Sequence, residues 1–127
     1  MIIGIGTDII EISRVERAVN RTPGFLNKVF SEVEIKTAGK RMESLAGYFA
    51  AKEAFGKALG IGISGFSLIE VWVQKDPFGK PFLRIKGKAE KLCLERGVER
   101  IHLSISHSKD KAIAFVILEG LEDETRK

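Results

Sequence analysis

Hydrophobic residues recur along the chain with two different spacings, which predict both strands and helices. Alternation of apolar and polar residues is typical of a half-buried strand, and spacing by three and four is typical of an amphipathic helix. The alternating segments are residues 2–7, 68–75, 82–86, 101–106 and 112–118. The helical segments are residues 9–20, 31–38, 45–59 and about 89–96. Two hairpin-like strand pairs with helices between them predict an α+β fold.

Two glycines share one face of the first predicted strand. Gly4 and Gly6 follow the period of two, and Asp8 comes next on the same face. A strand face without side chains lets another backbone or a ligand come close. Asp8 is therefore either the N-cap of the following helix, for which Asp is a favoured residue, or a ligand beside the bare face.

The first predicted helix has an apolar stripe on one face and three arginines on the other. These arginines are Arg14, Arg17 and Arg21. Such a row is usually a solvated surface. It is also what a docking site for an acidic helix requires.

The segment 45–59 is the strongest predicted helix, and it carries three charged residues close together. We expect the stem of Lys52 to pack beside the apolar stripe while its ammonium group reaches outward. Glu53 and Lys57 are spaced for a surface ion pair. They also lie beside Ala46 and Ala50, which would leave a shallow groove with a polar end.

Shorter motifs define two further features. Ser31 and Glu34 have the spacing of a capping box, which predicts a helix start. His102 and His107 lie five positions apart in one predicted strand, so their side chains point to opposite faces. They are therefore not expected to share a metal ion, and each is more typical of a structural histidine.

Composition narrows the class of protein. The chain has 127 residues with 44% hydrophobic and 30% charged residues, which predicts one globular domain spanning residues 1–127. The single Cys93 excludes a disulfide framework, no apolar run approaches ~20 residues, and the first residues lack a basic signal segment. We therefore expect a cytoplasmic protein without a membrane span, ending in a charged tail over residues 122–127.

The net charge of +4 suits an anionic partner. A dedicated nucleic-acid binder usually has a denser basic run and more aromatic residues, whereas this chain has one Trp and one Tyr. We therefore expect no nucleic-acid partner. A non-catalytic nucleotide- or RNA-binding module remains the alternative from another class.

Four segments, taken together, resemble a known family. Residues 4–12 (GIGTDIIEI) and 49–60 (FAAKEAFGKALG) are similar to the signature segments of the holo-acyl-carrier-protein synthases, the small-type phosphopantetheinyl transferases. Residues 30–34 (FSEVE) and 102–107 (HLSISH) resemble two further motifs of that family. The order of the motifs and the total length also match.

The resemblance implies an enzyme of fatty acid biosynthesis. Such enzymes transfer the 4′-phosphopantetheine group of coenzyme A to a serine of apo acyl carrier protein and release adenosine 3′,5′-bisphosphate. It also implies the family fold, a small antiparallel sheet packed with helices. The expected assembly is a homotrimer that binds Mg²⁺ and holds coenzyme A at the subunit interface. A transferase for a secondary-metabolism carrier is the alternative within this class.

The resemblance also implies roles for individual residues. Asp8 and Glu53 match the metal-binding carboxylates, and Lys57 matches the lysine near the pyrophosphate. These three are the expected catalytic residues, with Glu53 or a water beside it as the general base. The residues expected to bind the coenzyme are Lys52, Lys57, Gly79, Lys80, Pro81, Ser106, His107 and Arg41. Of these, residues 79–81 and 106–107 match segments that line the nucleotide end of the coenzyme in the family. Arg14 matches a carrier-docking residue, and Arg17 and Arg21 follow it by spacing.

The chain departs from the family pattern at Tyr48, where the family commonly has a basic residue. Lys52, Lys40 or Arg41 would then supply the cation. The chemistry is otherwise consistent, because Mg²⁺ takes about six oxygen ligands and is usually held by one or two carboxylates plus waters and substrate phosphates.

Overall fold

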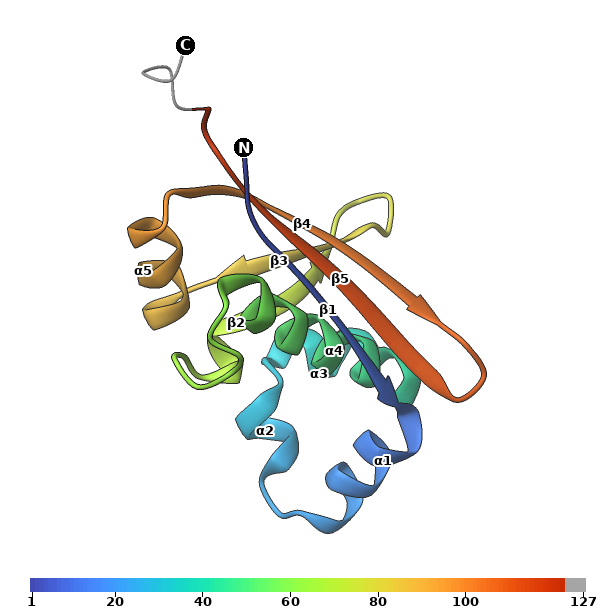
Figure 1. Cartoon of the computed structure of the whole chain (residues 1–127). Helices are drawn as coiled ribbons and strands as arrows, with labels where there is room; N and C mark the ends of the chain where they lie inside the picture. Colours follow the sequence, from blue (N-terminus) through green and yellow to red (C-terminus); the bar gives the residue numbers. More distant parts are fainter. Residues whose placement is uncertain (123–127) are drawn as a thin grey trace.

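The longest helix, α4, packs across one face of a three-stranded antiparallel sheet with the strand order β1-β5-β4 (Figure 1). The strands β2 and β3 form a separate two-stranded sheet. The computed structural model describes residues 1–122, so most of the predicted charged tail lies outside the described residues. This arrangement confirms the predicted α+β class.

The elements have the following bounds: β1 (Ile2–Glu11), α1 (Ile12–Arg21), α2 (Phe25–Val29), α3 (Glu32–Ala38), α4 (Met42–Leu59), η1 (Leu68–Glu70), β2 (Val71–Lys75), β3 (Pro81–Ile85), α5 (Gly87–Glu95), β4 (Val98–His107) and β5 (Lys111–Gly120).

The glycines of β1 lie against the backbone of α4. A side chain at Gly6 would overlap the carbonyl oxygen of Ala54, and one at Gly4 would overlap that of Ala58. The bare face of the strand is therefore filled by another backbone at these two positions. Asp8, the next residue on this face, is only partly buried.

The first strand is longer than the sequence pattern predicts, and this excludes a capping role for Asp8. Residues 8–11, most of which were expected to start a helix, pair with β5, with Asp8 opposite Ala114 and Glu11 opposite Lys111. The helix begins only at Ile12, and its N-cap is Glu11. Of the two alternatives for Asp8, the helix cap is thus excluded, because sheet pairing with β5 extends past it.

The structure differs from the predicted elements at two other places. The short helix α2 was not predicted, because its five residues are too few to show a helical period. The predicted strand 68–75 begins with the 3₁₀ turn η1, since Ser67 and Glu70 form a capping box that bends the backbone there. The capping box of Ser31 and Glu34 at the start of α3 is confirmed.

The core lies between α4 and the inner face of the three-stranded sheet. Small residues let the helix approach the strands closely: Ala46, Ala50 and Ala54 are fully buried, as are Ala112 and Ala114 on β5. None of the helices in the described part of the chain combines the length and hydrophobicity that a membrane crossing requires.

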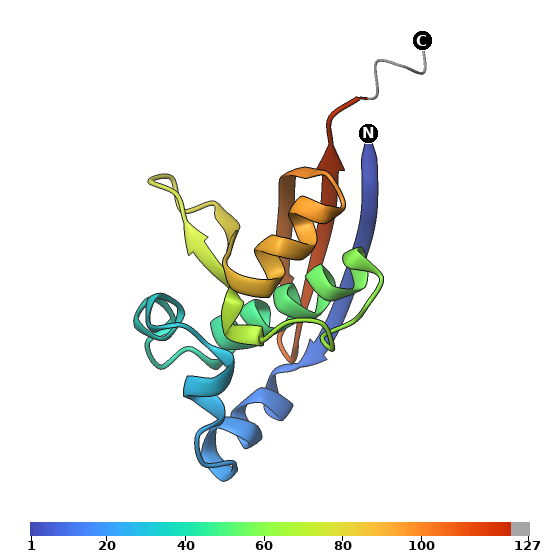
Figure 2. The same ribbon diagram turned by 90° about the vertical axis from the view of Figure 1, so that its left-hand side faces the viewer.

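The outer face of the same sheet is partly apolar, and no other helix or strand within residues 1–122 covers it. Ile5, Ile9, Ile113 and Phe115 are exposed by 54%, 59%, 42% and 43%. Figure 2 shows α4, α5 and the β2–β3 hairpin on one side of the sheet only. Contiguous apolar side chains on a protein surface commonly mark an interface.

Candidate functional site

The ammonium group of Lys57 joins α4 to β1 at Asp8. Its Nζ donates to Asp8 Oδ1 at 3.0 Å and to the carbonyl oxygen of Thr7 at 3.1 Å. The Asp8 side chain is 16% exposed and that of Lys57 is 53% exposed, so the pair lies at the edge of the core. Lys57 thus pairs with Asp8, whereas the helical spacing alone suggested a surface pair with Glu53.

Glu53 lies one helical turn before Lys57. The negative charge of Asp8 acts on the carboxyl group of Glu53. Partial burial raises the pKa of Glu53, the Asp8 carboxylate raises it further, and Lys57 partly opposes the shift. Two carboxylates that repel each other beside one ammonium group form an arrangement that a bound cation would stabilise.

The composition of this cluster fits magnesium better than zinc. Within residues 1–122, no group of three or more His, Cys, Asp and Glu side chains is placed to hold a metal ion. Two carboxylates without imidazole or thiolate are the usual protein share of a Mg²⁺ site, with waters and substrate phosphates completing it. Asp8 and Glu53 therefore fit this metal and leave room for phosphate oxygens.

Lys52 does not belong to this site. Its side chain is fully buried, and its Nζ donates to Glu34 Oε1 at 2.8 Å, to the carbonyl oxygen of Leu68 at 3.0 Å and to that of Val71. The prediction that its ammonium group reaches outward and binds the coenzyme is therefore wrong. Local patterns did not indicate this ion pair, because Glu34 lies on another helix and its spacing from Ser31 already indicated a capping role.

Two segments that the resemblance assigned to the nucleotide end of coenzyme A meet at one pocket. Pro81 and His107 both line a hollow of about 120 Å³. Its other lining residues are Ser44, Tyr48, Lys75 and Ile105. Sequence reasoning missed Ser44 and Lys75, although Lys75 is the strand partner of Pro81 and so was bound to lie near it.

His107 is held in a fixed orientation beside α4. Its Nε2 lies 2.9 Å from the carbonyl oxygen of Glu43, and Gly47 leaves the space that the imidazole ring occupies. A carbonyl oxygen only accepts hydrogen bonds, so Nε2 carries the proton in this contact. Ser106 points to the opposite face of β4, and both residues border a hollow of about 220 Å³ that also includes Ile9.

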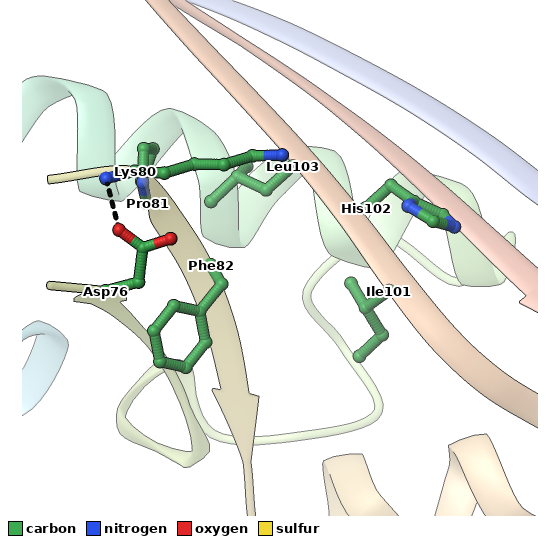
Figure 3. Close-up of a pocket in the computed structure, with 7 residues that line it drawn as sticks. All are labelled: Asp76, Lys80, Pro81, Phe82, Ile101, His102 and Leu103. Atoms are coloured by element: carbon green, nitrogen blue, oxygen red, sulfur yellow. Dashed lines mark hydrogen bonds between the residues drawn. The ribbon is translucent and has the colours of Figure 1, made fainter. Parts of the chain in front are cut away.

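The turn between β2 and β3 is fixed by Asp76. Its Oδ1 accepts from the backbone N–H groups of Phe78 at 2.8 Å and Lys80 at 2.9 Å, and Gly79 takes the left-handed conformation with φ 85°. Lys80, Phe82 and Leu103 are among the residues that line a hollow of about 330 Å³. Figure 3 shows the Lys80 side chain extending toward Leu103. Pro81 lines this hollow as well, so it borders both spaces.

Tyr48 fills the position where a basic residue was expected. Its side chain is buried with 4% exposure, and burial raises the pKa of its phenol, with Glu34 adding to the shift and Arg41 opposing it. Lys52 cannot replace the missing cation, because it is buried elsewhere. Lys75 lines the same pocket as Tyr48, and its side chain is exposed.

The remaining candidate cations lie on the surface. Arg14, Arg17 and Arg21 are exposed along α1, as the pattern predicted. Arg41 is exposed, and its guanidinium group donates to the carbonyl oxygens of Thr37 at 2.9 Å and Ala38 at 3.3 Å at the end of α3. The structure thus brings Asp8, Glu53 and Lys57 together, and none of the hydrogen bonds found within residues 1–122 joins these arginines to them.

Two residues of the candidate site, Asp8 and His107, lie on opposite edge strands of the three-stranded sheet. Asp8 is on the edge strand β1, His107 is on the edge strand β4, and β5 separates them. Within one chain, Asp8 and His107 are therefore separated by the width of one strand.

Comparisons with known proteins agree on one family. The family model of the 4′-phosphopantetheinyl transferase superfamily matches residues 4–116. The holo-[acyl-carrier-protein] synthase of Clostridium tetani is 50% identical over 124 residues, covering 94% of this chain and 98% of that protein. The synthase of Clostridium novyi is 46% identical over 122 residues, covering 94% of this chain and 88% of that protein.

A solved structure shows the same fold. The Helicobacter pylori holo-[acyl-carrier-protein] synthase in complex with coenzyme A has a TM-score of 0.83 and 33% sequence identity to this chain. The match covers 91% of this chain and 99% of that one.

Proposed function

We propose that this chain, which belongs to the 4′-phosphopantetheinyl transferase superfamily, transfers the 4′-phosphopantetheine group of coenzyme A to a serine of apo acyl carrier protein. Adenosine 3′,5′-bisphosphate is the leaving group. The observation that carries this proposal is the meeting of Asp8, Glu53 and Lys57 at one place, from the two segments that define the family resemblance. The relatives' names and the coenzyme A complex of a similar structure support it.

The reaction joins the serine oxygen to the phosphorus next to pantetheine and breaks the bond from that phosphorus to the bisphosphate. Such phosphoryl chemistry depends mainly on positioning and on stabilising negative charge. Lys57 lies on the exposed side of Asp8, where its ammonium group can reach a pyrophosphate oxygen as a point charge. Glu53 accepts the serine proton directly or through a water, and its raised pKa makes it a better base than an ordinary glutamate.

A divalent cation completes the proposed site. Asp8 and Glu53 would hold Mg²⁺, which supplies a Lewis acid for the phosphoryl oxygens and neutralises charge on the leaving group. The two carboxylates would orient the ion toward the phosphoryl oxygens.

We further propose that the enzyme is a homotrimer with its active sites between subunits. The outer sheet face carries exposed apolar side chains, including Ile5, Ile9 and Phe115, which a second copy would cover. Asp8 and His107 lie on opposite edge strands of the sheet, and a neighbouring copy could bring a second His107 beside Asp8. Both observations support an interfacial site.

The proposed carrier contact is the arginine face of α1. Arg14, Arg17 and Arg21 are exposed and suit an acidic helix of a carrier protein. We propose the acyl carrier protein of fatty acid biosynthesis as the substrate and the cytoplasm as the location. The family match over residues 4–116 supports one transferase domain spanning residues 1–127.

The test is to incubate the protein with coenzyme A, Mg²⁺ and several apo carrier proteins and to weigh each carrier by mass spectrometry. The proposal predicts a gain equal to the phosphopantetheine group on the fatty-acid-synthesis carrier. A gain only on a carrier of secondary metabolism would change the substrate assignment. No gain on any carrier, together with retention of RNA and no affinity for coenzyme A, would support a nucleic-acid-binding module.

A further inference from the structure

Lys52 and Glu34 form an ion pair inside the protein, away from the candidate site. Both side chains have 0% exposure, and Lys52 Nζ lies 2.8 Å from Glu34 Oε1. The same Nζ also donates to the carbonyl oxygens of Leu68 and Val71. An ammonium group has three donors, and here all three are used.

Glu34 is equally well bonded. Its Oε1 also accepts from the backbone N–H of Ser31 at 3.0 Å, and its Oε2 accepts from the backbone N–H of Val73 at 2.9 Å. Through these bonds one ion pair connects α3, α4, η1 and β2. No buried side-chain nitrogen or oxygen within residues 1–122 is left without a partner.

Burying this pair is an inefficient way to stabilise a fold. Removing charges from water costs free energy, and apolar side chains of similar volume often stabilise a core as well or better. Burial lowers the pKa of Lys52, although Glu34 opposes the shift. The pair therefore calls for a role other than stability, and buried polar groups are best known for fixing one arrangement among several.

The position of Lys52 on α4 indicates which arrangement is fixed. Glu53 follows Lys52 directly, and Ala54, the next residue, is in contact with Gly6 of β1. Successive residues of an α-helix are about 100° apart around its axis. The helix is thus held on one side by the ion pair and on the other by the glycine face, and Glu53 projects between these two contacts.

We infer that the buried Lys52–Glu34 pair is a positioning device, which fixes the rotation of α4 about its axis and so sets Glu53 against Asp8 on β1. This inference rests on the proposed function for its effect on activity. Lys52 is a positioning residue, since it touches neither the substrate region nor the two carboxylates. Its hydrogen bonds to the carbonyl oxygens of Leu68 and Val71 hold α4 in a fixed position relative to η1 and β2.

The test uses the single variant Lys52→Met and the double variant Lys52→Met/Glu34→Gln. The single variant leaves a buried carboxylate without its partner, whereas the double variant leaves no buried charge. Cys93→Ala is the matched control, because it empties a buried position on α5 that takes no part in the ion pair. For each protein, Mn²⁺ binding in the presence of coenzyme A, unfolding by urea and a crystal structure are measured.

We expect the double variant to regain stability without regaining metal affinity. The double variant should recover stability relative to Lys52→Met, yet it should bind Mn²⁺ about tenfold more weakly than the wild type, as expected when a group that orients a metal ligand is removed. Its crystal structure should show Glu53 turned away from Asp8. Cys93→Ala should lose stability and keep the wild-type Mn²⁺ affinity.

Two results would overturn the inference. One is a folded double variant that binds Mn²⁺ as the wild type does. The other is an unchanged placement of Glu53 beside Asp8 in the double variant's crystal structure. If the wild type itself neither binds Mn²⁺ nor modifies a carrier, the proposed function fails, and the crystal structures alone still decide the positioning role.

Discussion

The Nζ of Lys57 on α4 lies 3.0 Å from Oδ1 of Asp8 on β1. This contact joins the first strand to the central helix at the place where Gly4 and Gly6 bring the two backbones together. The same contact puts a cation beside two acidic groups, since the Asp8 carboxylate also raises the pKa of Glu53. Close packing of β1 on α4 is thus the structural origin of the candidate site.

Enlarging Gly6 should disrupt this packing. In Gly6→Ala the added methyl group would overlap the Ala54 carbonyl oxygen, and helix backbone cannot move aside as a side chain can. We expect the free energy of unfolding to fall by about 3 kcal/mol, the upper end of the usual range for overpacked cores. Urea unfolding measures this, with Leu94→Ala as a control at a position that is 73% exposed. A Gly6→Ala protein as stable as the control would contradict the packing argument.

The raised pKa of Glu53 predicts a pH-dependent stability in the absence of metal. A carboxyl group whose pKa is higher in the folded than in the unfolded state favours folding at low pH, and this contribution is lost as the pH rises through the folded-state pKa. Burial and the Asp8 charge cause the shift. Glu53→Gln, which cannot ionise, should therefore match the wild type at pH 4 and be the more stable protein at pH 7.

The measurement is urea unfolding of both metal-free proteins at the two pH values. Glu90→Gln provides the control, because Glu90 is an exposed glutamate on α5. A stability difference between Glu53→Gln and the wild type that is the same at both pH values would show that the fold does not perturb this carboxyl group.

Mixed assemblies test whether neighbouring subunits share one site. Asp8→Asn removes a carboxylate at the β1 edge, and His107→Ala alters the β4 edge, so each variant alone should be nearly inactive. If each site forms between two subunits, oligomers that contain both variants will have some interfaces at which one subunit supplies an intact Asp8 and its neighbour supplies an intact His107. We therefore expect partial recovery of carrier modification, measured by mass spectrometry. Mixed oligomers that stay as inactive as their parents would place each site within one chain.

Charge reversal on α1 should weaken the carrier contact specifically. Each exposed ion pair contributes up to about 1 kcal/mol, so Arg14→Glu/Arg17→Glu should raise the KM for the carrier about tenfold or more. The KM for coenzyme A should stay the same. The matched control is Lys88→Glu/Lys91→Glu on α5, which makes the same charge change on another exposed helix. An equal effect from both double variants would indicate general electrostatic attraction instead of a docking face.

Much of the fold follows from local patterns in the sequence. The capping box of Ser31 and Glu34 and the bare face of Gly4 and Gly6 each have a local physical cause. The extension of β1 through Glu11 does not, because it depends on pairing with residues 111–114 far along the chain. Local helix spacing predicted the wrong element there.

The candidate site, too, could be predicted only in part from the sequence. Spacing alone could not choose between a ligand role and a capping role for Asp8, and the resemblance supplied the choice. For Lys52 the resemblance led to an incorrect role, since only the three-dimensional structure shows Glu34 beside it in the core. Lys75 and Ser44 became candidates only when the fold placed them in the pocket with Pro81 and His107.

The central claim is that Asp8 and Glu53 hold one divalent cation beside Lys57. Its most direct test is a titration of the protein with Mn²⁺ in the presence of coenzyme A, followed by electron paramagnetic resonance. We expect one Mn²⁺ ion per site in the wild type. In both Asp8→Asn and Glu53→Gln, the affinity for Mn²⁺ should be at least about tenfold weaker. Wild-type affinity in both variants would contradict it and place the metal elsewhere.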